Sequence, residues 1–203
     1  MKNKVNFLLA FACLAGSAMA APQTFDFKDP KGVNNAVFKL DAPLEAISGN
    51  ATGVSGSVTF DPAAPADTKG KIVVKSDSLH LGNAMQQQHM HGDKWLDVAK
   101  YPEISFEVKE LKNVKTTGNE TTADVAGTFT LKGVSKEITV PAKLTYLKGM
   151  LGKRVPNQEG DLLVIRSNFK IKRSEFNIMP GQAEDKVSDE IDLALSIAGA
   201  SAK

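Results

Sequence analysis

The sequence predicts an all-β protein in which an antiparallel sheet curls into a barrel. Long stretches alternate strictly between apolar and polar residues, which is the pattern of a strand with one buried face. These stretches follow one another without helical patterns between most of them, and turn-forming residues separate them. Curling the sheet buries its apolar face and removes exposed edges. The inside of such a barrel is therefore where we look for a function.

The clearest alternation lies in three segments of the second half of the chain. In the first segment, Val125, Phe129 and Leu131 alternate with polar residues. The other two segments begin at Leu163 and Ile191. Because neighbouring residues of a strand point to opposite faces, we expect one phase to face inward. The residues expected on the inner face are Ile104, Phe106, Val108, Val125, Phe129, Leu131, Ile165, Phe169, Ile171, Ile191, Leu193 and Leu195.

The rest of the chain divides into further strands, one helix and one long loop. The strands are expected at residues 23–27, 36–40, 45–48, 54–60, 71–75, 104–111, 121–131, 137–146, 163–172 and 188–197. A helix is expected within residues 83–97, the only segment with a plausible helical pattern. Residues 147–161 carry several glycines and predict a long loop, and loops of that length are often functional.

The N-terminus has the features of a secretory signal peptide. Lys2 and Lys4 give a positive start, an apolar run follows, and small residues end at Ala20. The apolar run is too short to span a bilayer as a stable helix. We therefore expect residues 1–20 to be cleaved and residues 21–203 to form one periplasmic or secreted domain. No transmembrane segment is expected in the mature protein.

Charge and cysteine content narrow the function classes. Without Lys2 and Lys4, the basic side chains equal the 23 acidic ones, so no nucleic-acid partner is expected. Cys13 is the only cysteine, and lipid attachment to it would require a Leu-like residue where Ala10 stands. An outer-membrane barrel has an apolar outer face with aromatic girdles. This sequence has only 1 Trp and 2 Tyr, and the polar phase of its strands carries charges such as Lys170. An outer-membrane barrel is therefore not expected.

Three ordered motifs resemble those of the YceI family of secreted polyisoprenoid-binding proteins. The first is the segment HMHGDKWLDVAKYPEISFEV, which starts at His89, and the second is TLKGVSKEITV, which starts at Thr130. The third is KRSEFNI, which starts at Lys172. The segment that resembles the family spans roughly residues 36–197. Asn177 stands where the family usually has Gly, but Asn tolerates the left-handed backbone better than most residues.

The resemblance implies a lipocalin-like antiparallel barrel with one or two short helical segments and an elongated apolar cavity. The expected ligand is a polyisoprenoid or another long-chain amphiphile, and no other cofactor is expected. The resemblance gives no indication of the oligomeric state. The residues expected to line the cavity or its mouth are Phe60, His89, Trp95, Phe106, Phe129, Phe169, Ile171, Arg173 and Phe176.

Arg173 and the histidines each admit a second interpretation. Arg173 either meets the polar head of an amphiphile or fixes a strand corner through a carboxylate. His80, His89 and His91 are candidates for a haem or metal site, because imidazole is a common ligand of such metals. Residues two apart diverge on a helix, which argues against joint ligation by His89 and His91. A periplasmic haem- or metal-binding protein remains the alternative function.

Catalysis has little support in the sequence. Ser55 does not lie in a nucleophile elbow, because Ser57 occupies the position at which that motif needs Gly. A glycine-rich phosphate loop is not found, and the only cysteine lies in the expected signal peptide. We therefore expect a binding protein rather than an enzyme.

Overall fold

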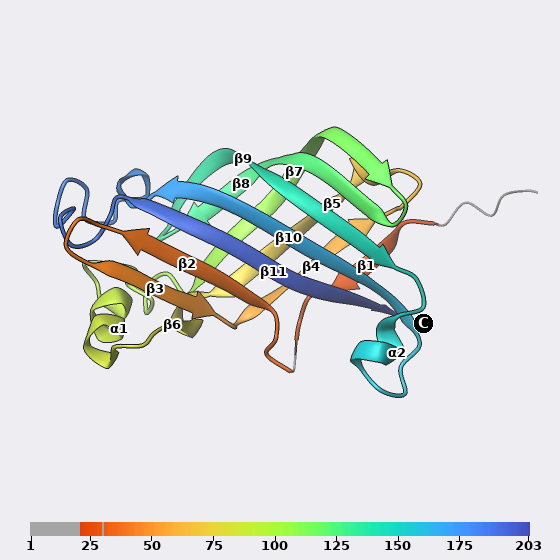
Figure 1. Ribbon diagram of the computed structural model, residues 1–203, viewed down its shortest axis with the longest axis horizontal. Helices are drawn as coiled ribbons and strands as arrows, with labels where there is room; N and C mark the ends of the chain where they lie inside the picture. The colour runs from red at the N-terminus through yellow and green to blue at the C-terminus, as the bar shows by residue number, and fades with distance from the viewer. Residues whose placement is uncertain (1–20, 30) are drawn as a thin grey trace, which may run out of the picture.

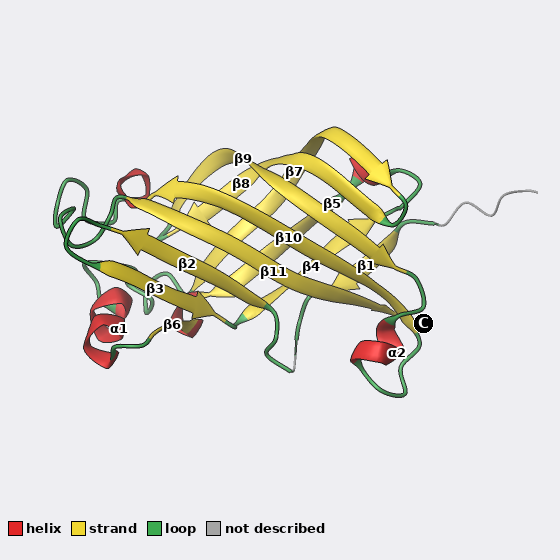
Figure 2. Cartoon of the chain, viewed as in Figure 1, coloured by secondary structure: helices red, strands yellow, loops and turns green. Residues whose placement is uncertain are grey.

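The computed structural model describes residues 21–29 and 31–203, so the expected signal peptide lies outside the described residues. The strands of the described part are β1 (Gln23–Asp26), β2 (Asn35–Asp41), β3 (Ala46–Ala51), β4 (Val54–Phe60), β5 (Lys69–Lys75), β6 (Leu79–Leu81), β7 (Glu103–Thr117), β8 (Glu120–Leu131), β9 (Val134–Leu147), β10 (Gly160–Lys172) and β11 (Glu190–Ala202). The helices are α1 (Ala84–His91) and α2 (Leu151–Arg154), with 3-10 turns at Pro65–Asp67, Ser76–Ser78 and Arg173–Phe176. Figures 1 and 2 show these elements.

Eight of these strands close into an antiparallel barrel, which confirms the expected fold class. The order around the barrel is β1-β4-β5-β7-β8-β9-β10-β11, and β1 closes the circle against β11, where Asp26 lies opposite Ala200. β11 has a second partner farther along its length, because Asp192–Ser196 pairs with β2. β3 and β6 follow β2 in order, so these three short strands extend the wall at one end of the barrel.

The long strands keep the inner face apolar through their register. Phe129 of β8 lies opposite Phe106 of β7, and Val125 lies opposite both Leu111 of β7 and Val140 of β9. A bulge in β7 between Val108 and Glu110 shifts the register by one residue, which brings Leu111 into the inward phase.

The observed elements differ from the sequence prediction mainly in short segments. Helix α1 covers only the first part of the expected 83–97 range, and the Asn83 side chain caps it by accepting hydrogen bonds from Met85 N and Gln86 N. The expected loop at 147–161 contains the single turn α2, and the three-residue strand β6 was not predicted. No helix among the described residues is long and apolar enough to cross a bilayer.

The barrel end beside α2 holds a core of large buried side chains, and we call it the closed end. Its core includes Phe25, Phe27, Phe60 and Leu163, each 0 to 2% exposed. The Tyr146 ring meets Phe25 edge-on, with ring centres 6.2 Å apart. Gly199 leaves room for the Phe27 ring, since a Cβ there would lie 2.7 Å from a ring carbon. The α2 segment adds Leu151, which is fully buried.

Two carboxylates fix the loops that cover the closed end. Asp161 is buried and accepts hydrogen bonds from Tyr146 Oη at 2.6 Å and from Gly149 N at 2.7 Å. Burial alone raises the pKa of Asp161, but these hydrogen bonds outweigh it and hold the pKa below its ordinary value. Asp29 has a lowered pKa for the same reason: against the effect of burial, it accepts hydrogen bonds from three backbone N–H groups and pairs with Arg154.

Candidate functional site: the barrel cavity

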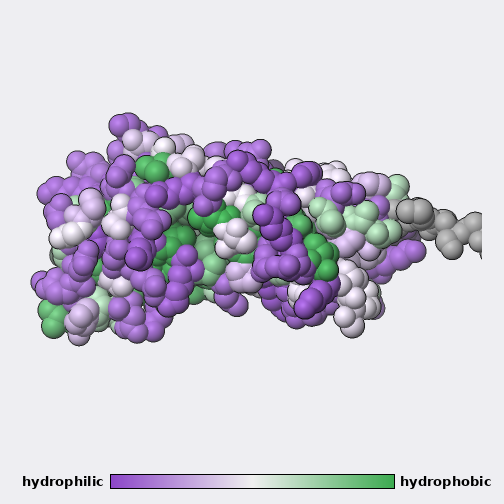
Figure 3. All heavy atoms as spheres, turned by 90° about the horizontal axis from the view of Figure 1, so that it is seen from above, coloured by the Kyte–Doolittle hydropathy of each residue, from purple (hydrophilic) through white to green (hydrophobic). Residues whose placement is uncertain are grey.

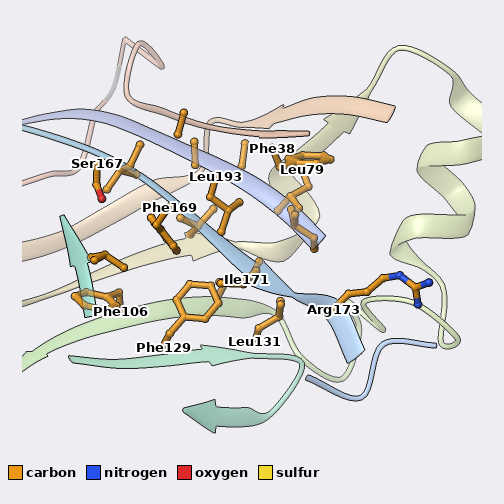
Figure 4. Close-up of a pocket in the computed structure, with 18 of the residues that line it drawn as sticks. Phe38, Leu79, Phe106, Phe129, Leu131, Ser167, Phe169, Ile171, Arg173 and Leu193 are labelled. Carbon is orange, nitrogen blue, oxygen red and sulfur yellow. The ribbon is translucent and has the colours of Figure 1, made fainter. Parts of the chain in front are cut away.

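The other half of the barrel encloses a cavity of about 420 Å³, which we call the central cavity. It extends from the end of the barrel beside α1 to Val58 and Leu144 of the closed-end core. All twelve residues expected on the inner face line this cavity, which confirms the predicted orientation of the strands. Figure 4 shows Phe106, Phe129, Phe169 and Leu193 converging on the same space from different strands. A volume of this size is in the range of small-molecule sites.

The cavity exists where the wall is widened by β2, β3 and β6. Phe38 and Leu40 of β2, Ile47 of β3, and Leu79 and Leu81 of β6 all line it. These short strands continue the sheet beyond β11, so more strands surround this half than the closed end. The inward side chains therefore leave a space between them, and several of the inward residues on β7, β10 and β11 are only half-buried.

The two buried hydroxyl groups of the cavity wall are already paired with the protein. Ser167 is buried in β10, and its Oγ donates to the carbonyl of Pro141 at 2.6 Å. Thr68 is buried as well, and its Oγ1 donates to the carbonyl of Pro65 at 2.6 Å. Across the described residues, every buried side-chain nitrogen or oxygen has a hydrogen-bond partner. A hydrocarbon ligand can therefore fill the interior without leaving a buried polar group of the wall unpaired.

The mouth of the cavity lies beside α1 and carries exposed polar groups. Glu45, Gln86, His89 and Lys186 line the cavity there and come from the β2–β3 turn, α1 and the loop before β11. Helix α1 has no buried residue. Its C-terminal end is held by His91, whose Nε2 lies 2.9 Å from the carbonyl oxygen of Leu79.

Arg173 is fully buried and holds the loop beside the mouth. Its guanidinium donates to five backbone carbonyls, those of Ile178, Met179, Gln182, Val187 and Ser188. The guanidinium also lies 5.6 Å from the ring centre of Trp95. Figure 4 shows the side chain pointing away from the cluster of apolar cavity residues. Arg173 thus holds the chain after β10 in place, as the second interpretation expected, but it binds backbone carbonyls and not a carboxylate.

Seven of the nine residues expected at the ligand site line the central cavity. They are His89, Trp95, Phe106, Phe129, Phe169, Ile171 and Arg173.

The other two, Phe60 and Phe176, are not among the residues that line the central cavity. Phe60 faces inward but belongs to the closed-end core, beyond the floor of the cavity. Phe176 follows β10 in a 3-10 turn and packs edge-on behind Phe129, with ring centres 5.5 Å apart. Asn177 ends that turn with φ of 56°, so the left-handed conformation expected of the family's Gly is kept.

Sequence reasoning missed the contribution of β2, β3 and β6 to the cavity. The alternation of Phe38 and Leu40 in β2 was a usable signal, because both are buried and lie in one phase. Strand β6 has three residues, too few to show a period. The route of β2 along the far part of β11 depends on pairing between distant segments, which alternation alone does not specify.

The three histidines do not meet in one place. His80 lies on β6 opposite Asn50 and is exposed, while His89 is exposed on α1. His91 is next to Leu79 as described above. Within residues 21–29 and 31–203, no group of three or more His, Cys, Asp or Glu side chains is arranged to hold a metal ion.

Antiparallel strands closed around one apolar cavity define a small lipocalin-like barrel. The family model of the YceI-like domain matches residues 29–198, so the chain belongs to the YceI family. A UPF0312 protein of Yersinia pestis (strain Pestoides F) is 32% identical over 209 residues, with 100% of both chains covered.

Solved structures of bacterial proteins have the same fold. The YCEI protein of Campylobacter jejuni is 26% identical, with a TM-score of 0.62 over 76% of this chain and 85% of that one. A polyisoprenoid binding domain from Saccharophagus degradans, described as implicated in plant cell wall breakdown, is 13% identical. Its TM-score is 0.63, and 89% of this chain and 99% of that chain are covered. At that identity, the similarity to the Saccharophagus domain shows the fold alone.

Proposed function

We propose that this protein is a periplasmic or secreted carrier that holds the chain of a polyisoprenoid or a similar amphiphile in the central cavity. The observation that carries the proposal is an apolar interior whose polar wall groups, Ser167 and Thr68, already donate to backbone carbonyls. The name of the Saccharophagus domain and the sequence motifs support an isoprenoid chain. The exposed polar groups at the mouth, such as His89 and Lys186, would lie near the head group.

The energetics of the proposal depend on the length of the buried chain. Each buried methylene contributes about 0.8 kcal/mol before the cost of ordering the ligand. Tight binding is therefore compatible with very few polar contacts. We propose binding rather than catalysis, because the hydroxyls of Ser167 and Thr68 donate to carbonyls and are not oriented for attack on a substrate.

The test is a titration of delipidated protein with geraniol, farnesol, geranylgeraniol and solanesol. Trp95 is the only tryptophan of the sequence and lines the cavity, so its emission should report occupancy directly. We expect affinity to rise with chain length and then to level off once the cavity is full. Equal affinity across the series would overturn the carrier proposal. Straight-chain alcohols of matched length separate an isoprenoid preference from general hydrocarbon binding.

A matched pair of variants locates the binding. Leu195 faces the cavity and Ser196 faces outward on the same strand. Leu195→Asn should weaken geranylgeraniol binding by roughly tenfold, because a polar group then has to be desolvated by the ligand. Ser196→Asn should leave the affinity unchanged. Equal affinities for the two variants would place the ligand outside the cavity, while haem absorbance or bound metal in purified protein would support the histidine alternative.

A further inference from the structure

The backbone ladder between β9 and β10 is missing in the half of the barrel that contains the cavity mouth, and we call this stretch the gap. The two strands pair only where Ala142–Leu147 lies opposite Leu162–Ser167. Beyond that point, residues 134–141 still pair with β8 and residues 168–172 still pair with β11. No strand in the described part of the chain pairs with the two edges that face each other. Both strands are thus intact while they separate from one another.

Pro141 accounts for the place at which the ladder ends. Its carbonyl accepts a hydrogen bond from Ser167 Oγ of β10, so the backbone of Pro141 faces the β10 side. Pro has no N–H, and the next backbone bond of the ladder cannot form there. A side chain of β10 satisfies the carbonyl instead. The gap between β9 and β10 is therefore encoded in the sequence.

Apolar residues of the cavity wall border the gap. Val140 of β9 and Phe169 and Ile171 of β10 line the cavity beside it. Ile138, the preceding residue of the same β9 phase, is half-buried and packs with the group around Phe129. Figure 3, which looks down on the upper side of Figure 1, shows apolar surface along the middle of the molecule between polar borders.

Apolar side-chain packing and one weak ion pair hold the gap in place of backbone hydrogen bonds. The ion pair between Lys136 and Glu175 spans 3.8 Å with both side chains about half exposed, and such pairs contribute little. Beside the mouth, by contrast, the loop is fixed by the five carbonyl bonds of Arg173. The Lys132 Nζ in addition donates to the carbonyls of Asp93 and Lys94 after α1.

We propose that the gap between β9 and β10 is a side portal through which the hydrocarbon chain of an amphiphile enters and leaves the cavity. The inference rests on the proposed carrier function. A chain that moves sideways through the portal breaks no backbone ladder bond, and its polar head stays in water throughout. The apolar edges formed by Val140, Phe169 and Ile171 cover the chain as it passes.

The portal can be tested by a reversible cross-link. Thr139 of β9 and Lys170 of β10 are exposed on the two sides of the gap, and a Cys13→Ser background leaves introduced cysteines as the only thiols. The test variant carries Thr139→Cys and Lys170→Cys, bridged by a bis-methanethiosulfonate reagent and released by dithiothreitol. The control carries Lys143→Cys and Arg166→Cys, which lie opposite one another where the strands are already paired.

Stopped-flow Trp95 emission then follows geranylgeraniol binding to each form. Bridging Thr139→Cys to Lys170→Cys should slow both association and dissociation by about tenfold, because the wall can no longer separate locally. The equilibrium affinity should change little, and dithiothreitol should restore the rates. The control should bind at the same rate with and without its bridge.

Two other outcomes have different meanings. If the bridged test variant loads as fast as its reduced form, the portal is overturned while the carrier function stands. If neither the bridged forms nor the unmodified protein binds any alcohol of the series, the carrier function fails and the portal fails with it.

Discussion

The two ends of this barrel are made by the same long strands but have different interiors. At the closed end, eight strands form the circle, and large buried side chains such as Phe27 and Leu163 form its core. At the end beside α1, the wall gains β2, β3 and β6 and loses the β9–β10 ladder. The inward residues there are equally apolar but leave a cavity between them. The number of strands in the wall, more than the hydrophobicity of the sequence, decides whether the interior is core or cavity.

The two ends of the barrel also have different roles. A filled end supplies the burial energy that a barrel without disulfides needs, while a hollow end gives up part of that energy and keeps space for a ligand. Stability and binding should therefore respond to substitutions at different ends.

The largest expected effect separates the two interiors directly. Phe27→Ala removes a fully buried ring and should destabilise the ligand-free protein by about 3 to 5 kcal/mol. Phe169→Ala removes a half-buried ring that already borders the cavity and should cost only about 1 to 2 kcal/mol. Urea unfolding of both variants measures the difference. Equal losses would mean that the cavity half is as well packed as the closed end.

The next effect concerns Arg173, the one fully buried arginine among the described residues. Arg173→Leu leaves several backbone carbonyls without donors and should cost about 2 to 4 kcal/mol. Hydrogen exchange should increase first in residues 178–188, which the guanidinium holds. Arg173→Lys can restore only some of the hydrogen bonds, so its stability should lie between that of the unmodified protein and that of Arg173→Leu. A uniform increase in exchange over the whole barrel would contradict a local role at the mouth.

A smaller effect should appear at low pH and should arise at the closed end. Because the pKa of Asp161 is lower in the folded protein than in the unfolded chain, its contribution to stability is present above the unfolded pKa. That contribution is lost as the pH falls through the folded pKa. Asp161→Asn should therefore flatten the acid side of the stability curve measured by urea unfolding. Glu45→Gln, at an exposed position of the mouth, is the control and should leave the curve unchanged.

Sequence patterns predicted the alternating strands but not the features that create the site. Alternation placed Phe106, Phe129 and Phe169 on the inner face, because period two and burial are local properties. It did not distinguish Phe60, which is inward but belongs to the filled end. That distinction depends on how many strands surround each level of the barrel. Strand number at each level follows from pairing between distant segments, such as β2 with β11.

The sequence prediction also missed two local irregularities. The bulge after Val108 exchanges the inner and outer phases of β7 within one strand. The end of the β9–β10 ladder at Pro141 was visible as a proline inside an expected strand, which is a signal for an edge or an interruption. Read in that way, the proline would have predicted a break in the wall.

The smallest expected effect compares the two helices at the two ends. Helix α1 has no buried residue, whereas α2 contains the fully buried Leu151. Asn83→Ala removes the side chain that caps α1 and should weaken that helix by about 1 kcal/mol. Because α1 buries so little surface, its unfolding should not destabilise the barrel, and the urea midpoint of the whole protein should hardly change. Amide exchange at Met85 and Gln86, whose N–H groups donate to Asn83, should nevertheless become faster. A drop in global stability as large as the local effect would show that α1 unfolds together with the barrel.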